Sequence, residues 1–114
     1  MANGCIFCKI AKKELPAKIQ YQDKEIVAFD DINPKAPVHI LIVPKKHIES
    51  VNTLVANDAS IIGKMIIVAQ KLVKEKGIDQ SGFRLIFNTG KNSGQIVDHI
   101  HLHLIGGQTL SNMV

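Results

Sequence analysis

The chain has 114 residues, which suits a single domain, and its 14 lysine and arginine residues against 10 acidic residues give a formal net charge of +4. The hydrophobic fraction of 46% and the charged fraction of 21% are ordinary for a globular protein and exclude intrinsic disorder. The basic residues are scattered, which favours a small anionic ligand over a nucleic-acid partner. No apolar stretch approaches the roughly 20 residues of a membrane span, and the start MANGCIFCKI has no basic region before an apolar run. We therefore expect a cytoplasmic protein with no membrane partner.

The chain up to Val43 predicts a short helix followed by three strands. We expect the helix at residues 5–13 and the strands at 18–22, 25–30 and 39–43, with a hairpin-like turn at 22–24. Pro16 follows the helix and is unable to continue it. In the third strand, Ile40 and Ile42 share one face, whereas His39 and Leu41 point the other way.

The rest of the chain predicts one long helix and two more strands. Apolar residues from about Asp58 to Lys76 recur at the spacing of a core-facing helical stripe, with Asp58 or Asn57 as the N-cap and Gly77 at the end. The stripe consists of Ile61, Ile62, Met65, Ile66, Ala69, Leu72 and Val73. Strands are expected at 83–88 and 97–105. This order of elements indicates one α+β domain over residues 1–114, with a five-stranded antiparallel sheet, one long helix and one short helix.

Three histidines at a spacing of two residues stand in the last predicted strand, His99-Ile100-His101-Leu102-His103-Leu104. Alternate side chains of a strand face opposite sides, so the three imidazoles are expected on one face, about 6.7 Å apart. The intervening apolar residues would then anchor the strand in the core. The alternative is an ordinary half-buried strand that carries histidine on its solvated face.

Imidazole titrates close to physiological pH, so it can attack an electrophile when neutral and donate a proton when charged. A covalent phosphohistidine divides one difficult displacement at phosphorus into two easier ones. The rival chemistry is metal binding, because His-x-His on a strand also converges on Zn²⁺ in hydrolytic sites. Metal binding is the weaker interpretation, because the sequence has no nearby third carboxylate or histidine pattern that is not already used.

The segment GQIVDHIHLHLIGG at residues 94–107 resembles the signature of the histidine-triad (HIT) family, and its closing Gly106-Gly107 is similar to the Hint branch. The resemblance extends through CIFCKIAKKELPAKI, FDDINPKAPVHILIVPKKHI and FNTG. It implies a HIT-like fold, a homodimer with a shared sheet and a pocket for a nucleoside monophosphate. It also implies transfer of a nucleotidyl group onto the central histidine, from which water removes it.

The resemblance also implies a role for each histidine of this cluster. His101 would be the nucleophile, and His99 would set its tautomer and orientation. His103 would touch the phosphate or the leaving group, and His39 would complete the cluster. Asn88 matches the asparagine that contacts phosphate in the family.

The nucleotide pocket is assigned by the same resemblance. Asp31 matches the acid that accepts the ribose hydroxyls, and backbone N–H groups near Gln95, Ile96 and Val97 could cradle phosphate oxygens. Animal Hint proteins carry a serine at the position of Ile96, and isoleucine has no hydroxyl to offer a leaving group. The apolar slot for the base would be formed by Phe7, Ile10, Phe29 and Ile32, although residues of this type are more often plain core.

Cys5 and Cys8 form a C-x-x-C motif that can supply two of the four ligands of a tetrahedral zinc site. Many bacterial HIT proteins pair such cysteines with two histidines, whose positions here are His47 and His99. The resemblance therefore implies a structural Zn²⁺ that supports the histidine strand and takes no part in the chemistry. Alternatively, both cysteines are small buried hydrophobes and His47 is a surface residue.

These observations favour an enzyme that hydrolyses adducts of purine nucleoside monophosphates such as AMP, including P–N bonds, through a nucleotidyl-histidine intermediate. A dinucleoside polyphosphate hydrolase is one alternative. The other is a nucleotide-binding adaptor with weak turnover. The intact His101 argues against the adaptor.

Overall fold

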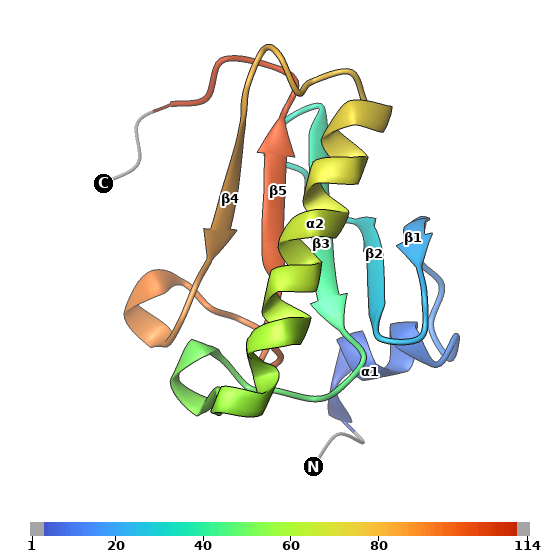
Figure 1. Cartoon of the computed structure of the whole chain (residues 1–114), viewed down its shortest axis with the longest axis vertical. Helices are drawn as coiled ribbons and strands as arrows, with labels where there is room; N and C mark the ends of the chain where they lie inside the picture. Colours follow the sequence, from blue (N-terminus) through green and yellow to red (C-terminus); the bar gives the residue numbers. More distant parts are fainter. Residues whose placement is uncertain (1–3, 112–114) are drawn as a thin grey trace.

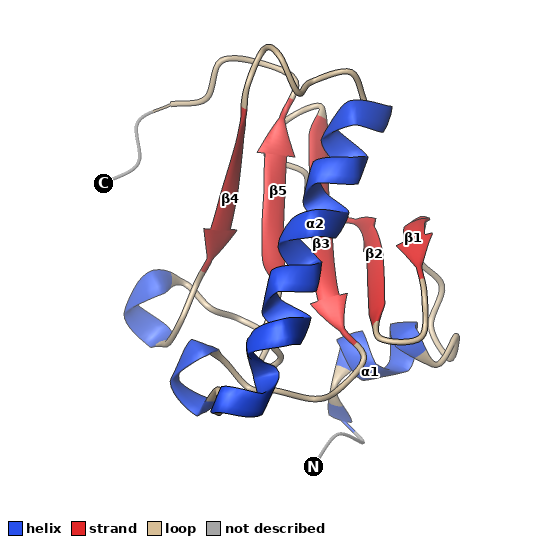
Figure 2. Ribbon diagram, in the orientation of Figure 1, coloured by secondary structure: helices blue, strands red, loops and turns tan. Residues whose placement is uncertain are grey.

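Five antiparallel strands form one sheet in the spatial order β1-β2-β3-β5-β4, and the long helix α2 lies across one face of it (Figure 1). The computed structural model describes residues 4–111. The strands are β1 (Ile19–Gln22), β2 (Ile26–Asp30), β3 (Val38–Pro44), β4 (Phe83–Phe87) and β5 (Leu102–Gly106), and the helices are α1 (Ile6–Ala11) and α2 (Ala59–Glu75). The predicted α+β class, the five-stranded antiparallel sheet, the long helix and the short helix are confirmed. Figure 2 also draws as helix the short 3-10 turns at Val51–Thr53, Ala56–Asp58 and Lys91–Ser93.

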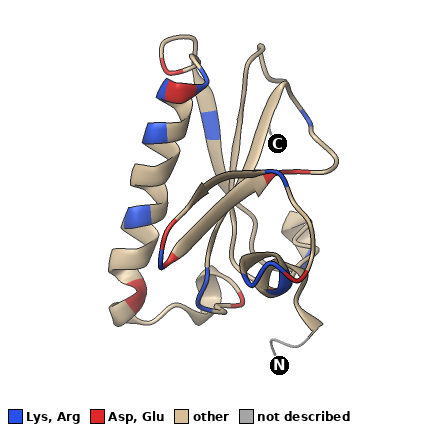
Figure 3. Cartoon of the chain, turned by 90° about the vertical axis from the view of Figure 1, so that its right-hand side faces the viewer, with Lys and Arg blue, Asp and Glu red and all other residues tan. Residues whose placement is uncertain are grey.

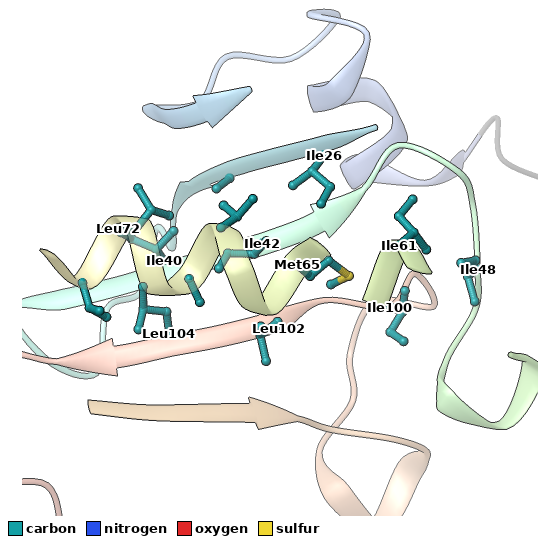
Figure 4. Close-up of a cluster of buried hydrophobic side chains, with 14 of the residues drawn as sticks. Ile26, Ile40, Ile42, Ile48, Ile61, Met65, Leu72, Ile100, Leu102 and Leu104 are labelled. Atoms are coloured by element: carbon teal, nitrogen blue, oxygen red, sulfur yellow. The ribbon is translucent and has the colours of Figure 1, made fainter. Parts of the chain in front are cut away.

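The main core lies between α2 and the sheet. Ile40 and Ile42 of β3 and Leu102 and Leu104 of β5 are almost fully buried in it (Figure 4), because alternate residues of each strand face the helix. The buried residues of α2 are Ile61, Met65, Val68, Ala69, Leu72 and Val73. Val68 takes the buried place that the sequence assigned to Ile66, which is 39% exposed. The predicted stripe was thus correct except at its edge.

The opposite face of the sheet carries a second, smaller apolar cluster that α1 covers. Its buried members are Phe7, Val27, Phe29, Leu41 and Val43. Phe7 comes from α1 and the others from β2 and β3, and the rings of Phe7 and Phe29 meet edge to face at 5.5 Å. The sheet is therefore buried on both sides at its centre, which fixes the position of β3.

The pairing of β3 with β5 sets the geometry of two histidines. Leu41 lies opposite His103 and His39 lies opposite Ile105. His39 and His103 are therefore diagonal neighbours on the face away from α2. Gly106 ends β5 at a crowded point, where a Cβ atom would lie 2.8 Å from Ile78 Cδ1. A side chain there would displace the end of Ile78 and press on Gly82 and Phe83 at the start of β4.

The last predicted strand is wrong in its bounds. The sequence predicted a strand over 97–105, but β5 begins at Leu102, and residues 97–101 form a loop (Figure 2). His99 and His101 are buried in that loop, with exposed fractions of 0% and 8%, whereas His103 is half-buried within β5. The three imidazoles therefore do not line one strand face, because the chain before β5 leaves the sheet to reach α1.

Basic and acidic residues are distributed over the helices, strands and loops, and α2 carries both signs (Figure 3). Within residues 4–111, no helix is long and apolar enough to span a membrane. Lys46 and Asp58 form a local ion pair at 2.7 Å, in which the nearly buried carboxylate also accepts the backbone N–H of Val55. This pair ties the segment after β3 to the start of α2.

Candidate active site and metal centre

A cavity of ≈ 650 Å³ opens on the face of the sheet away from α2. Its size is in the range of small-molecule sites, and most of its lining is apolar. The predicted site residues that line it are His39, His101, His103, Asn88, Asp31, Ile96, Val97, Phe7, Ile10, Phe29 and Ile32. Loops and strands from across the sequence thus meet at one place, as a nucleotide site requires.

His101 is held by the backbone next to it. Its Nδ1 lies 2.7 Å from the carbonyl oxygen of His99. A carbonyl oxygen only accepts, so the proton of neutral His101 is on Nδ1 and a lone pair remains on Nε2. Phe7 packs edge to face against the His101 ring at 5.0 Å. Burial lowers the pKa of His101, which favours the neutral nucleophilic form.

Asp31, His39 and His103 form a second group, here called the carboxylate–histidine cluster. His39 Nε2 lies 3.0 Å from His103 Nδ1 and 3.3 Å from Asp31 Oδ2. The backbone N–H of Lys35 donates to His39 Nδ1 at 3.0 Å. His39 therefore carries its proton on Nε2 and donates it into this cluster.

The tautomer of His103 follows from that of His39. Since His103 Nδ1 accepts from His39 Nε2–H, the proton of neutral His103 is on Nε2. Burial, and then the neighbouring His101 and His39, lower the pKa of His103 to about 4. Burial likewise lowers the pKa of His39. His103 is therefore neutral near pH 7 and offers a hydrogen-bond donor rather than a positive charge.

Cys5, Cys8, His47 and His99 form the cysteine–histidine cluster, whose four donor atoms all lie within 4.8 Å of one another. Cys8 Sγ lies 3.3 Å from His47 Nδ1 and 3.5 Å from His99 Nδ1, and Cys5 Sγ lies 3.3 Å from His99 Nδ1. Two sulfurs and two imidazole nitrogens are a donor set that can hold a metal ion. Burial is the main cause that raises the pKa of the Cys8 thiol to about 11, so its thiolate needs a compensating cation.

His99 connects the cysteine–histidine cluster to His101. Its Nε2–H donates to the carbonyl of Pro44 at 2.8 Å, which leaves the Nδ1 lone pair turned toward the two sulfurs. Burial lowers the pKa of His99 to about 4 and keeps it neutral, as a metal ligand must be. The side chain of His99 does not face the cavity, so the expected control of the His101 tautomer comes from its backbone carbonyl.

The prediction for Gln95 needs a correction. Its backbone N–H donates to Gly90 within the turn, and its side chain accepts from Gly90 N–H and donates to the carbonyls of Glu49 and Val97. Gln95 therefore braces the loop and is not among the residues that line the cavity. The neighbouring Ile96 does line it and is 91% exposed at its rim.

Several residues that line the cavity were not predicted from the sequence. Leu41 and Ile105 line it because they share a strand face with His39 and His103, a relation that the two-residue period could have revealed. Lys35 contributes through its backbone N–H, for which no side-chain signal exists. The other missed lining residues are Ile6, Leu15, Pro16, Ala17, Asp30, Asn33, Ile86 and Gly94.

Known proteins are similar to this chain along almost its whole length. The family model described as scavenger mRNA decapping enzyme C-term binding matches residues 4–113. The purine nucleoside phosphoramidase of Escherichia coli strain K12 is 47% identical over 114 residues, which cover 100% of this chain and 96% of that protein. Protein HitA of Neisseria gonorrhoeae is 44% identical over 104 residues, covering 91% and 96%.

Solved structures give the same result. A HIT family hydrolase from Legionella pneumophila superposes with a TM-score of 0.93 at 46% identity, covering 95% of this chain and 96% of that chain. A histidine triad protein from Clostridium difficile superposes with a TM-score of 0.95 at 46% identity, covering 98% and 97%. The family predicted from the histidine motif is thereby confirmed, and the chain belongs to the histidine-triad (HIT) family.

Proposed function

We propose that this protein is a hydrolase that cleaves the P–N bond of purine nucleoside phosphoramidates, such as amides of AMP, through a covalent nucleotidyl-His101 intermediate. The observation that carries the proposal is the single tautomer of His101, which lines the cavity with Nδ1–H bound to a carbonyl and a lone pair on Nε2. The similarity to the phosphoramidase of Escherichia coli supports the substrate class.

The reaction follows from these positions in two steps. His101 Nε2 attacks phosphorus, the N–P bond to His101 forms, and the P–N bond to the amine breaks as the amine takes a proton from solvent. Water then attacks phosphorus, the bond to His101 breaks, and one proton is released as the nucleoside monophosphate leaves. His103 Nε2–H donates a hydrogen bond to a phosphoryl oxygen and stabilises the negative charge that develops there.

Nucleotide recognition is proposed for the rest of the cavity. Asp31 accepts the ribose hydroxyls, and Asn88, at the end of β4, contacts phosphate together with the backbone near Ile96 and Val97. Phe7 and Phe29, which are 5% and 3% exposed, form part of the cavity wall against which the base would pack. Ile10 and the 92% exposed Ile32 complete the slot.

Zinc is the ion proposed for the cysteine–histidine cluster. Its two thiolates and two neutral imidazoles match the closed S₂N₂ sites that Zn²⁺ prefers. Cys5, Cys8, His47 and His99 would hold it, and its contribution would be to crosslink α1, the segment after β3 and the loop before β5. It would supply no nucleophile.

A homodimer is proposed as the working assembly of this single domain. The edge position of β4 supports it, because an unpaired edge strand presents free backbone groups to a second strand. Sedimentation at several protein concentrations tests it: a mass of one chain throughout would contradict the dimer. The cytoplasmic location stays a prediction.

The central experiment compares wild-type protein with His101→Ala on a panel of adenosine phosphoramidates and diadenosine polyphosphates. We expect hydrolysis of the phosphoramidates by the wild type and a loss of more than about 10³-fold in kcat in the variant, with AMP binding retained. Faster turnover of the dinucleotides would favour the dinucleoside polyphosphate hydrolase. No turnover of any substrate would favour the nucleotide-binding adaptor.

A further inference from the structure

We propose that the carboxylate–histidine cluster couples recognition of the ribose to the chemical step. Ribose hydroxyls that bind Asp31 commit the Nε2 proton of His39 to His103, and His103 then holds its own Nε2–H toward the phosphoryl group. His39 is the positioning residue of this coupling, because it acts through its two neighbours. The inference rests on the proposed function, which supplies the ribose role of Asp31 and the phosphoryl role of His103.

The cluster holds one proton between two acceptors. His39 Nε2–H has His103 Nδ1 at 3.0 Å and the carboxylate oxygen Oδ2 of Asp31 at 3.3 Å. Burial lowers the pKa of His39, and the charge of Asp31 acts in the opposite direction. The carboxylate and the His103 ring therefore compete for the same proton, and a stronger bond to one weakens the bond to the other.

The heavy atoms around this proton have little freedom to move. The side chain of His39 is only 3% exposed, and its Nδ1 accepts the backbone N–H of Lys35. The backbone carbonyl of His39 accepts the N–H of Asp31 at 2.9 Å. Asp31 Oδ1 is held in turn by the Asn33 N–H at 2.8 Å. A ligand at this cluster therefore changes how the proton is shared rather than where the rings lie.

Asp31 is nevertheless open to a ligand. Its side chain is 19% exposed and lines the cavity. Hydroxyls that donate to the carboxylate draw negative charge from Oδ2 and weaken its attraction for the His39 proton, which then bonds to His103 Nδ1 alone. His103 keeps its own proton on Nε2. Its ring centroid lies 4.9 Å from that of His101, so the effect ends beside the proposed nucleophile.

The coupling predicts that the ribose hydroxyls affect the rate as well as the affinity. A contact that is equally strong in the ground state and the transition state lowers KM and leaves kcat unchanged. The phosphoryl contact of His103 strengthens as negative charge develops, so an effect that passes through His39 appears in kcat. If Asp31 only anchored the ribose, removal of the hydroxyls would change KM alone.

The kinetic experiment compares phosphoramidates of adenosine and of 2′,3′-dideoxyadenosine that carry the same amine. With the wild type, we expect KM to rise and kcat to fall about fivefold to tenfold when both hydroxyls are removed. In Asp31→Asn and in His39→Ala, the ratio of the two kcat values should fall below about twofold, because the coupling is broken. Asp79→Asn removes an exposed carboxylate in the turn between α2 and β4, outside the cavity lining. It is the matched control and should keep the wild-type ratio.

Two kinetic results would overturn the proposal. One is an equal kcat for the two nucleotides in the wild type, which would reduce Asp31 to an anchor. The other is a kcat ratio in His39→Ala as large as that of the wild type, which would show that the effect of the hydroxyls does not pass through His39.

A second measurement needs neither turnover nor a substitution, so it holds even if His39→Ala fails to fold. Proton and nitrogen-15 NMR of the imidazoles is recorded for the wild type alone, with saturating adenosine and with saturating 2′,3′-dideoxyadenosine. We expect adenosine to shift the His39 Nε2 proton downfield and slow its exchange with water, and dideoxyadenosine to leave both nearly unchanged. Identical spectra with the two nucleosides contradict the coupling. If the wild type hydrolyses no phosphoramidate, the proposed function fails, while this comparison still decides whether the ribose acts on His103.

Discussion

Both histidine clusters contain imidazole side chains, but backbone hydrogen bonds leave a free lone pair in one cluster and a free N–H donor in the other. In the cysteine–histidine cluster, the carbonyl of Pro44 takes the His99 Nε2 proton and leaves a lone pair toward the sulfurs. In the carboxylate–histidine cluster, the Lys35 N–H occupies His39 Nδ1 and leaves a proton on Nε2. A cation needs the lone pair, and a hydrogen-bond chain needs the proton.

The same hydrogen bonds favour metal binding at the cysteine–histidine cluster over the carboxylate–histidine cluster. The three donor atoms of Asp31, His39 and His103 are close enough together to be considered as ligands. Metal binding at His39 Nε2 would require its proton to move to Nδ1, where it would meet the Lys35 N–H. The backbone thus selects the chemistry of each cluster. The predictions below test this difference.

The largest effect is expected from breaking the cysteine–histidine cluster with Cys8→Ser. A ligand that binds only the folded state at 1,000 times its Kd contributes about 4 kcal/mol, which corresponds to roughly 15–30 °C in Tm. We expect a fall of that order in calorimetry, together with loss of zinc by metal analysis. Asp31→Asn is the control and should keep its zinc. A full zinc complement in Cys8→Ser would contradict the ligand set.

The next largest effect is expected in the carboxylate–histidine cluster, from His103→Ala. The substitution removes the Nε2–H donor that we assign to a phosphoryl oxygen, so kcat should fall about 10²-fold. Zinc content should stay at the wild-type level, because His103 is not a member of the cysteine–histidine cluster. The measurement is steady-state kinetics together with metal analysis of the same sample. Loss of zinc along with activity would contradict the separation of His103 from the cysteine–histidine cluster.

The pH dependence of stability should differ between wild type and His103→Ala. Unfolded histidine titrates near 6.5, whereas burial holds the pKa of folded His103 at about 4, so the unfolded chain binds more protons between these values. The contribution of His103 to stability is therefore complete above pH 6.5 and is lost as the pH falls toward 4. We expect Tm to drop less between pH 7 and pH 5 in the variant, measured with zinc in excess. Parallel curves would rule out the buried neutral form.

The smallest effect is expected from Ile96→Ser, which restores the hydroxyl of the animal Hint proteins at the cavity rim. Because Ile96 is 91% exposed, stability should change by less than about 0.5 kcal/mol. If solvent protonates the leaving amine, kcat should change by no more than about threefold. A rise of tenfold or more for alkylamine adducts would show that the lack of a positioned hydroxyl limits turnover by the native protein.

Much of the fold could be predicted because its signals are local. The two-residue period of β3 and the helical spacing of α2 each follow from residues close together in the sequence, and both are correct apart from Ile66. The strand predicted at 97–105 failed because alternation alone does not reveal where a chain leaves its sheet. His99 and His101 continue the two-residue spacing of β5 in the sequence, although they lie in a loop in which His99 contacts Cys5 and Cys8.

The sequence by itself determined the family, the class of fold and the identity of the histidines, because these depend on residue type and spacing. Only the tertiary structure decided what each histidine is prepared to do. Tautomers are set by backbone atoms of Pro44, His99 and Lys35, and any residue type can supply such atoms. The three similar imidazoles of the motif thus differ in which ring nitrogen carries the proton and in what the other nitrogen faces, through contacts that no side-chain pattern encodes.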